Sequence, residues 1–94
     1  MPARRPVTPL TPVQAFALAV KASRTRANLT QEELAHRAKL SLTSIARIET
    51  GAHGVRLETI LRLGCALNSS GGQLVDECAR IVLRSGGRID GDQE

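Results

Sequence analysis

The chain has 94 residues, which is enough for one small domain with short loops. Aromatic residues make up 1% of the sequence, which excludes a nucleic-acid surface built on stacked rings and favours an aliphatic, helical core. The formal net charge is +4, and residues 1–67 hold ten basic but only four acidic residues. A basic body of this kind favours an anionic partner, with nucleic acid first and a membrane surface second.

Residue types that carry catalysis or bind metal are sparse and scattered. Cys65 and Cys78 form no CxxC pair, His36 and His53 stand apart, and we therefore expect neither a metal site nor a cofactor. Both cysteines fall in apolar helical patterns and are expected to be small buried residues. No nucleophile elbow or phosphate loop is present, so an enzyme is not expected. No apolar run of 18 residues occurs, so the prediction is a cytoplasmic protein without a membrane partner.

The two ends of the chain differ in composition from the middle. All four prolines lie in the first twelve residues, so residues 1–10 are predicted to form a flexible arm. Arg4 and Arg5 of this arm could enter a minor groove of DNA. Residues 85–94 are rich in glycine and acidic residues and are predicted to form a flexible tail. Residues 11–84 then form the folded domain.

Helical periodicity and capping signals divide the domain into five helices. Thr11 with Gln14, and Thr30 with Glu33, have the spacing of capping boxes. Ser70 with Gln73 repeats this spacing. The predicted helices span residues 12–26, 31–38, 42–49, 57–67 and 71–84, and the fold class is all-α.

The second and third predicted helices are short and only a few residues apart. Ala35, in the middle of the second helix, would let the third helix cross it closely. Ile45 and Ile48, three residues apart on the third helix, would pack into that crossing. This is the requirement of a helix-turn-helix, in which the second helix of the pair projects into the DNA major groove.

A family resemblance rests on several motifs in order: LTQEELA at residues 29–35, Ser41 and Ile45, RIETG at residues 47–51, LETILRL at residues 57–63, and Ala66-Leu67. Over residues 14–75 the chain resembles the lambda-repressor-like domains of the Cro type, also called XRE-type helix-turn-helix domains. The resemblance implies a compact five-helix fold. It also implies a sequence-specific, double-stranded DNA-binding transcriptional regulator.

The resemblance also implies roles for individual residues. Base-reading positions on the exposed face of the third helix correspond to Leu42, Thr43, Ala46 and Arg47. Gln31 and Ser44 match positions near the DNA backbone, and the family's internal salt bridge corresponds to Arg24 with Glu49. By charge and place, further backbone contacts are expected from Lys39, His53, Arg56 and Arg26, and Arg62 is another phosphate neutraliser. Arg47 is the best candidate for direct readout because its guanidinium can bond guanine O6 and N7 together.

Three positions depart from the family pattern. Lys39 and Asn28 stand where the family usually has Gly, and asparagine tolerates a left-handed conformation better than lysine does. Arg56 stands where a small polar residue usually caps the fourth helix. We expect that cap to be lost and a positive charge to be placed near the DNA backbone.

The fifth helix carries an apolar stripe that includes Leu74, Cys78, Ile81 and Val82. Because four helices suffice to enclose a small core, part of this stripe is expected to be exposed and to form a homodimer interface on a palindromic operator. The alternative is that the stripe closes the core of a monomer. A different function also stays open: an antitoxin, or another interaction module, that binds a toxin or the transcription machinery and uses DNA for autoregulation. The sequence does not separate these from a restriction-modification controller or a phage-type repressor.

Overall fold

The computed structural model describes residues 9–89, and the predicted all-α, five-helix fold is confirmed. The helices are α1 (Pro12–Arg26), α2 (Gln31–Ala38), α3 (Leu42–Thr50), α4 (Leu57–Ala66) and α5 (Gly71–Arg84). Compared with the expected ranges, α3 ends one residue later and α4 one residue earlier. Within residues 9–89 there is no strand, and no helix has the length and hydropathy needed to cross a bilayer.

Hydrogen bonds at the helix starts explain where the helices begin. Thr11 Oγ1 accepts from the Gln14 backbone N–H at 3.2 Å, and the Thr11 N–H donates to Gln14 Oε1 at 3.0 Å. The same reciprocal pair joins Thr30 and Glu33 at the start of α2. The third expected capping box is only half formed. Ser70 accepts from the Gln73 N–H at 3.0 Å, but the Gln73 side chain accepts from the neighbouring Ser69 hydroxyl instead of the Ser70 N–H.

Three non-glycine residues adopt left-handed backbone conformations in the connections between helices. Asn28, Lys39 and Asn68 have φ angles of 59°, 58° and 55°. At Lys39, where the family usually has glycine, the lysine itself occupies the left-handed conformation that glycine adopts most easily. Arg56 is the N-cap residue before α4 and makes no side-chain cap hydrogen bond, as expected for an arginine at this position.

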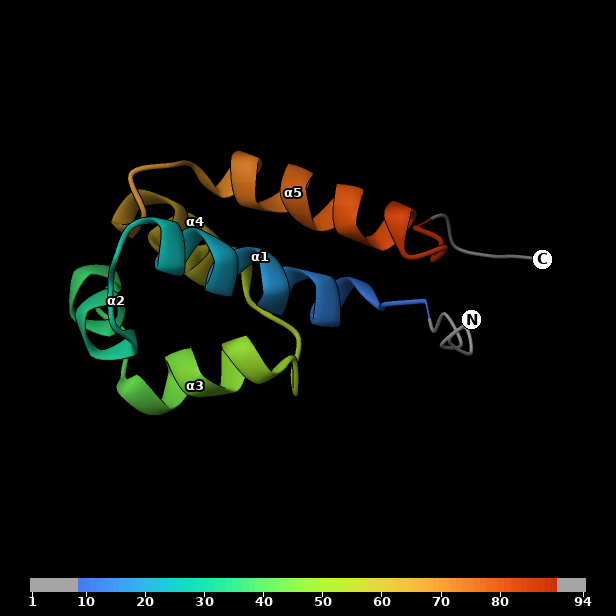
Figure 1. The fold of residues 1–94 in the computed structure, drawn as a ribbon. Coiled ribbons are helices and arrows are strands. Elements are labelled where there is room, and N and C mark those ends of the chain that lie inside the picture. Colours follow the sequence, from blue (N-terminus) through green and yellow to red (C-terminus); the bar gives the residue numbers. More distant parts are fainter. Residues whose placement is uncertain (1–8, 90–94) are drawn as a thin grey trace, which may run out of the picture.

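The helices place the candidate DNA-binding pair on one side of the molecule (Figure 1). There, α1 runs between α5 on one side and α3 on the other, and α2 joins α3 at one end. α5 packs against α1 and α4, and α3 packs against α1 and α2. The described chain begins and ends at the same end of the molecule, where the Leu10 N–H donates to Ser85 Oγ at 2.9 Å.

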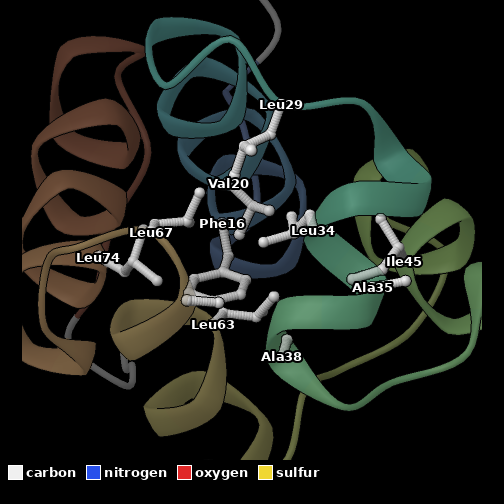
Figure 2. Packing of buried hydrophobic residues seen from close by; sticks show 11 residues of the cluster. Phe16, Val20, Leu29, Leu34, Ala35, Ala38, Ile45, Leu63, Leu67 and Leu74 are labelled. Carbon is white, nitrogen blue, oxygen red and sulfur yellow. The ribbon is translucent and has the colours of Figure 1, made fainter.

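The core is aliphatic around a single phenylalanine. Figure 2 shows Phe16 of α1 between Leu34 of α2 and Leu63 of α4, with Leu67 and Leu74 closing the side toward α5. The remaining members of the cluster are small or branched side chains: Val20, Leu29, Ala35, Ala38, Ile45 and Ala66. α5 is therefore part of the enclosure of the core, and four helices do not close it.

This packing corrects the expected dimer stripe on α5. Leu74 and Val82 are 2% and 0% exposed, so neither is available to a second molecule. Cys78 and Ile81 are half-buried. The alternative reading of the stripe, closure of the monomer core, is the one that holds for Leu74 and Val82.

The two cysteines differ from each other. Cys65 is exposed on α4, on a side of the helix that faces away from the core. The expectation that it is buried was therefore wrong. Cys78 is half-buried, its thiol donates to the Pro12 carbonyl oxygen at 3.2 Å, and burial raises the pKa of this thiol. The second thiol thus belongs to the contact between α5 and the start of α1.

Candidate nucleic-acid interface

The turn between α2 and α3 is built by backbone hydrogen bonds and a small side chain. The Leu40 N–H donates to the Ala35 carbonyl at 2.9 Å, which closes the left-handed end of α2 at Lys39. Ser41 then caps α3 by accepting from the Ser44 N–H at 3.0 Å. Ala35 and Ile45 are both buried, so α3 crosses α2 closely and is held by its inner face. The opposite face of α3 is left for solvent.

That outer face carries most of the residues expected to read bases. Leu42, Thr43 and Arg47 are exposed on it, and Leu42 retains 44% of its surface despite being apolar. Ala46 is only partly exposed, because it lies at the edge of the packed face. Thr43 and Arg47 are four residues apart and so lie one above the other on the helix. Together they offer a hydroxyl and a guanidinium beside two apolar side chains.

A pocket of about 180 Å³ lies where α3 meets the following loop and the first turn of α4. Ser44 and Arg47 line it from α3, and His53 and Arg56 line it from the loop. The structure thus brings together four of the residues expected at DNA. Thr59 completes the pocket from α4 and was missed in the sequence. A signal for it was present in the sequence: Thr59 is a polar residue three positions after Arg56 and lies within the first turn of α4.

Some basic residues in the described part of the chain are paired with acidic side chains, and others are not. Arg62 pairs with Glu58 at 2.7 Å, and Arg80 and Arg84 pair with Glu77 at 2.7 and 3.6 Å. These pairs leave little free positive charge on α4 and α5, and Arg62 is a weaker candidate for phosphate than its sequence position implied. Around the helix pair, by contrast, Lys39, Arg47 and Arg56 make no ion pair with any residue from 9 to 89. Lys21, Arg26 and Arg37 are also without an ion pair to any residue from 9 to 89, so free positive charge surrounds α3 but is not confined to it.

Arg26 does not belong to this group, which corrects its expected role at the DNA backbone. It lies in a polar groove with Gln73, Glu77 and Arg80 of α5, and its Nη2 donates to Ser23 Oγ at 3.1 Å. α5 and α3 lie on opposite sides of α1 (Figure 1), so Arg26 is turned away from any duplex bound at α3. In this groove the hydrogen bond from Arg80 holds the pKa of the Glu77 carboxyl below its ordinary value.

Arg24 and Glu49 form an ion pair between the end of α1 and the end of α3. Arg24 Nε lies 2.7 Å from Glu49 Oε2, and Nη2 lies 3.1 Å from Oε1. Nη1 of the same guanidinium donates to the Leu29 carbonyl at 2.8 Å. The hydrogen bond to Glu49 raises the pKa of Arg24 above its ordinary value. Arg24 therefore holds helices together and is not free to neutralise a phosphate alone.

Gln31, the first residue of α2, lies against this ion pair. Its Nε2 donates to Glu49 Oε1 at 3.0 Å, so its carboxamide is held in place before any DNA is bound. Arg4 and Arg5 of the predicted arm lie outside the described residues, as do residues 90–94 of the predicted tail. No group of three or more His, Cys, Asp or Glu side chains that could hold a metal ion occurs in residues 9–89.

Two amphipathic helices joined by a tight turn, with the second exposed and flanked by unpaired basic residues, define a helix-turn-helix protein. Residues 15–77, more than half of the chain, match the family described as a helix-turn-helix domain. The chain belongs to this family, and the resemblance seen in the sequence is confirmed.

Solved structures with the same fold include several regulators. The restriction-modification controller protein C.AhdI from Aeromonas hydrophila is 31% identical with a TM-score of 0.64, over 66% of this chain and 94% of that one. The clp gene regulator ClgR from Corynebacterium glutamicum is 22% identical with a TM-score of 0.75, over 84% and 85%. The controller protein C.Esp1396I, solved as a tetramer on its natural 35-base-pair operator, is 20% identical with a TM-score of 0.71, over 79% and 97%. Curated protein sequences contain no match.

Proposed function

We propose that this protein is a sequence-specific transcriptional regulator that places α3 in the major groove of a palindromic operator. The observation that carries this proposal is the coincidence of an exposed α3 face with unpaired basic residues on both sides of it. Lys39 lies in the turn before α3. Arg56 lies in the loop after α3 and lines the same pocket as Arg47. Phosphates on either side of a major groove would meet positive charge there, while the helix between them meets the bases.

Four residues of α3 are proposed to read the base edges. Arg47 donates to guanine O6 and N7, and Thr43 bonds a base or contacts a thymine methyl group. Leu42 and Ala46 offer apolar contacts only, so part of the specificity comes from thymine methyl groups and from DNA shape. Ser44, Lys39, His53 and Arg56 contact the backbone and fix the position of α3 along the duplex.

The regulator is proposed to act as a homodimer, through a surface that differs from the one expected from the sequence. We define the dimer face as the exposed apolar residues Leu57 and Leu61 of α4 and Val75 and Leu83 of α5. Leu61 lies beside the start of α5: a Cβ added at Gly71 would lie 3.0 Å from Leu61 Cδ2, and Val75 follows Gly71 by one helical turn. Several exposed apolar side chains on two neighbouring helices are typical of an interface.

Two copies suit the proposed site because one α3 reads only a few base pairs. A pair of recognition helices separated by one turn of DNA, about 34 Å, matches a palindrome. The relatives support this proposal: C.AhdI is a restriction-modification controller, ClgR is a gene regulator, and C.Esp1396I occupies its operator as a tetramer. The same relatives support a regulator without catalytic activity.

The experiment that tests the function is selection of binding sites from random duplexes with the purified protein, followed by variants. Arg47→Ala should weaken binding to the selected operator by about tenfold or more and relax the preference at one guanine. Arg84→Ala, on α5 and away from α3, is the matched control and should bind as the wild type does. Equal loss by the Arg47 variant on operator and random DNA would remove its base-reading role. Failure of the wild type to enrich any sequence would overturn the proposed function.

A further inference from the structure

The pocket between α3, the following loop and α4 has an apolar lining that a DNA backbone does not need. Leu40, Ile48 and Val55 line it, and these three side chains are half-buried and pack against the core. The sugar-phosphate backbone presents charged oxygens to a protein, and cations and hydroxyl groups suffice to bind it. An apolar surface combined with a few polar groups is instead typical of a pocket that binds a small molecule.

Three side chains that can carry positive charge also line this pocket. They are Arg47 of α3 and His53 and Arg56 of the loop, and all three are exposed at its open side. Arg47 and Arg56 make no ion pair with any residue from 9 to 89. A guanidinium binds a carboxylate through two parallel hydrogen bonds, so each arginine offers a complete binding group for an organic acid.

Acidic side chains near the pocket are held elsewhere. None of the residues from 9 to 89 that line it is acidic. Glu49 and Glu58 are the nearest acidic residues along the chain, and each is paired with an arginine outside the pocket, Arg24 or Arg62, at 2.7 Å. An anion that enters the pocket would therefore meet cations and no free carboxylate.

The volume of the pocket limits the size of its ligand. It measures about 180 Å³, which is below the range of roughly 300–1,000 Å³ found for pockets that take drug-sized molecules. Ser44 and Thr59 add hydroxyl groups to its polar side. These dimensions and groups fit a compact organic anion with one acidic group and an apolar body.

We propose that this pocket is an effector site for a small organic acid. The carboxylate is held by Arg47 and Arg56, and the apolar body packs against Leu40, Ile48 and Val55. The regulatory consequence rests on the proposed function, in which Arg47 reads a base. One guanidinium cannot hold a carboxylate and a guanine at once, so the acid releases the protein from its operator. By linkage, the operator weakens binding of the acid by the same factor.

The site is tested first on the free protein, with benzoate as the probe and the ionic strength held constant because salt screens charge. Benzoate should shift the amide NMR signals of His53, Gly54 and Thr59 saturably. Acetate has the charge without the apolar body, and benzyl alcohol has the body without the charge. Both should bind at least about tenfold more weakly than benzoate does. Absence of saturable shifts with benzoate would overturn the site, and equal binding of acetate or inorganic phosphate would overturn the ligand class.

A pair of arginine variants tests whether the pocket holds the carboxylate. Arg56→Met keeps an unbranched side chain and removes the guanidinium, so the affinity for benzoate should fall by about tenfold or more. Arg37→Met is the matched control, since Arg37 is an exposed arginine on α2 without an ion pair to residues 9–89 and does not line the pocket. It should bind benzoate as the wild type does. Circular dichroism checks that both variants are folded, and equal affinities in the two variants would overturn the assignment of Arg56.

The regulatory step is tested on the selected operator. Saturating benzoate should lower the affinity of the wild type for the operator by about tenfold, and the operator should lower the affinity for benzoate by the same factor. Operator binding by Arg56→Met should no longer respond to benzoate at that concentration. Benzoate binding with unchanged operator affinity would overturn the regulatory step. A wild type that selects no operator would instead overturn the proposed function, whereas the titration of the free protein decides the pocket by itself.

Discussion

Gly64 of α4 lies so close to the backbone of Gly71, the first residue of α5, that α4 has no room for a side chain at this point. A Cβ added to Gly64 would lie 2.3 Å from the Gly71 backbone nitrogen and 2.3 Å from the Ser70 carbonyl carbon. Because backbone atoms cannot move aside as the end of a side chain can, this contact fixes how α5 leaves α4. The relationship matters for the proposed function because the same two helices carry the proposed dimer face.

Gly64→Ala should therefore be among the most destabilising small substitutions in the chain. The methyl group forces α4 and α5 apart, at a cost of about 3 kcal/mol or more in the free energy of unfolding. Thermal or urea denaturation measures the loss. Gly72→Ala is the control: the nearest atom to its added Cβ is Ser70 Oγ at 3.7 Å, so this variant should be at least as stable as the wild type. A stable Gly64→Ala protein would show that α5 can shift without unfolding.

Removal of Glu49 should destabilise the domain, because Arg24 would be left partly buried without its partner. We expect Glu49→Ala to lower the free energy of unfolding by about 2–3 kcal/mol. The exposed Arg62–Glu58 pair on α4 provides the comparison, and Glu58→Ala should cost no more than about 0.5 kcal/mol. Urea denaturation of the three proteins measures both values. Similar losses in the two variants would mean that burial of the Arg24–Glu49 pair contributes nothing.

Lys39→Gly should raise stability and weaken DNA binding at the same time. Lys39 has a φ of 58°, a conformation that costs a side chain roughly 1 kcal/mol and that glycine adopts freely. We expect a gain of about 1 kcal/mol in the free energy of unfolding. Loss of one phosphate-neutralising cation should reduce the slope of log K against log salt concentration by about one.

Asn28→Gly is the matched comparison for Lys39→Gly. Its φ is 59°, but asparagine tolerates this conformation, so its gain should be the smaller of the two. Asn28 also carries no charge, and its salt dependence should stay unchanged. A Lys39→Gly protein that melts at or below the wild-type temperature would contradict the backbone strain at Lys39. An unchanged salt dependence of binding would contradict the contact between Lys39 and the DNA.

Leu61→Asp should give a folded monomer. Leu61 is exposed on the proposed dimer face, so a carboxylate there would be solvated in a single molecule but would lose solvent in the dimer. Operator affinity should fall by about a hundredfold, because the two half-sites would no longer be bound together. Sedimentation and operator binding measure the two effects.

Leu18→Asp is the control for the dimer face, since Leu18 is an exposed leucine on α1 outside that face. This variant should sediment and bind as the wild type does. Monomer formation by Leu18→Asp but not by Leu61→Asp would move the interface to α1. A wild type that is monomeric at tens of micromolar, both free and on DNA, would refute the dimer.

Local signals in the sequence determined the helices and the helix-turn-helix. Capping at Thr11 and Thr30, apolar spacing and short connections depend on residues three or four positions apart, and such interactions are complete within one helical turn. The turn also followed from local chemistry, since Ala35, Ser41 and Ile45 can be judged from their spacing alone. The half-formed cap at Ser70 failed because Ser69, one residue earlier, competes for the Gln73 side chain.

Only the tertiary structure decided which apolar residues are core and which are surface. The stripe on α5 looks the same in the sequence whether it faces α1 and α4 or a second molecule, and packing buries Leu74 and Val82 while leaving Val75 and Leu83 exposed. The same reason explains Arg26, which periodicity places on α1 but which the crossing of α1 and α5 turns away from α3. It also explains the bond between Gln31 and Glu49, because two residues 18 positions apart meet only when three helices have packed.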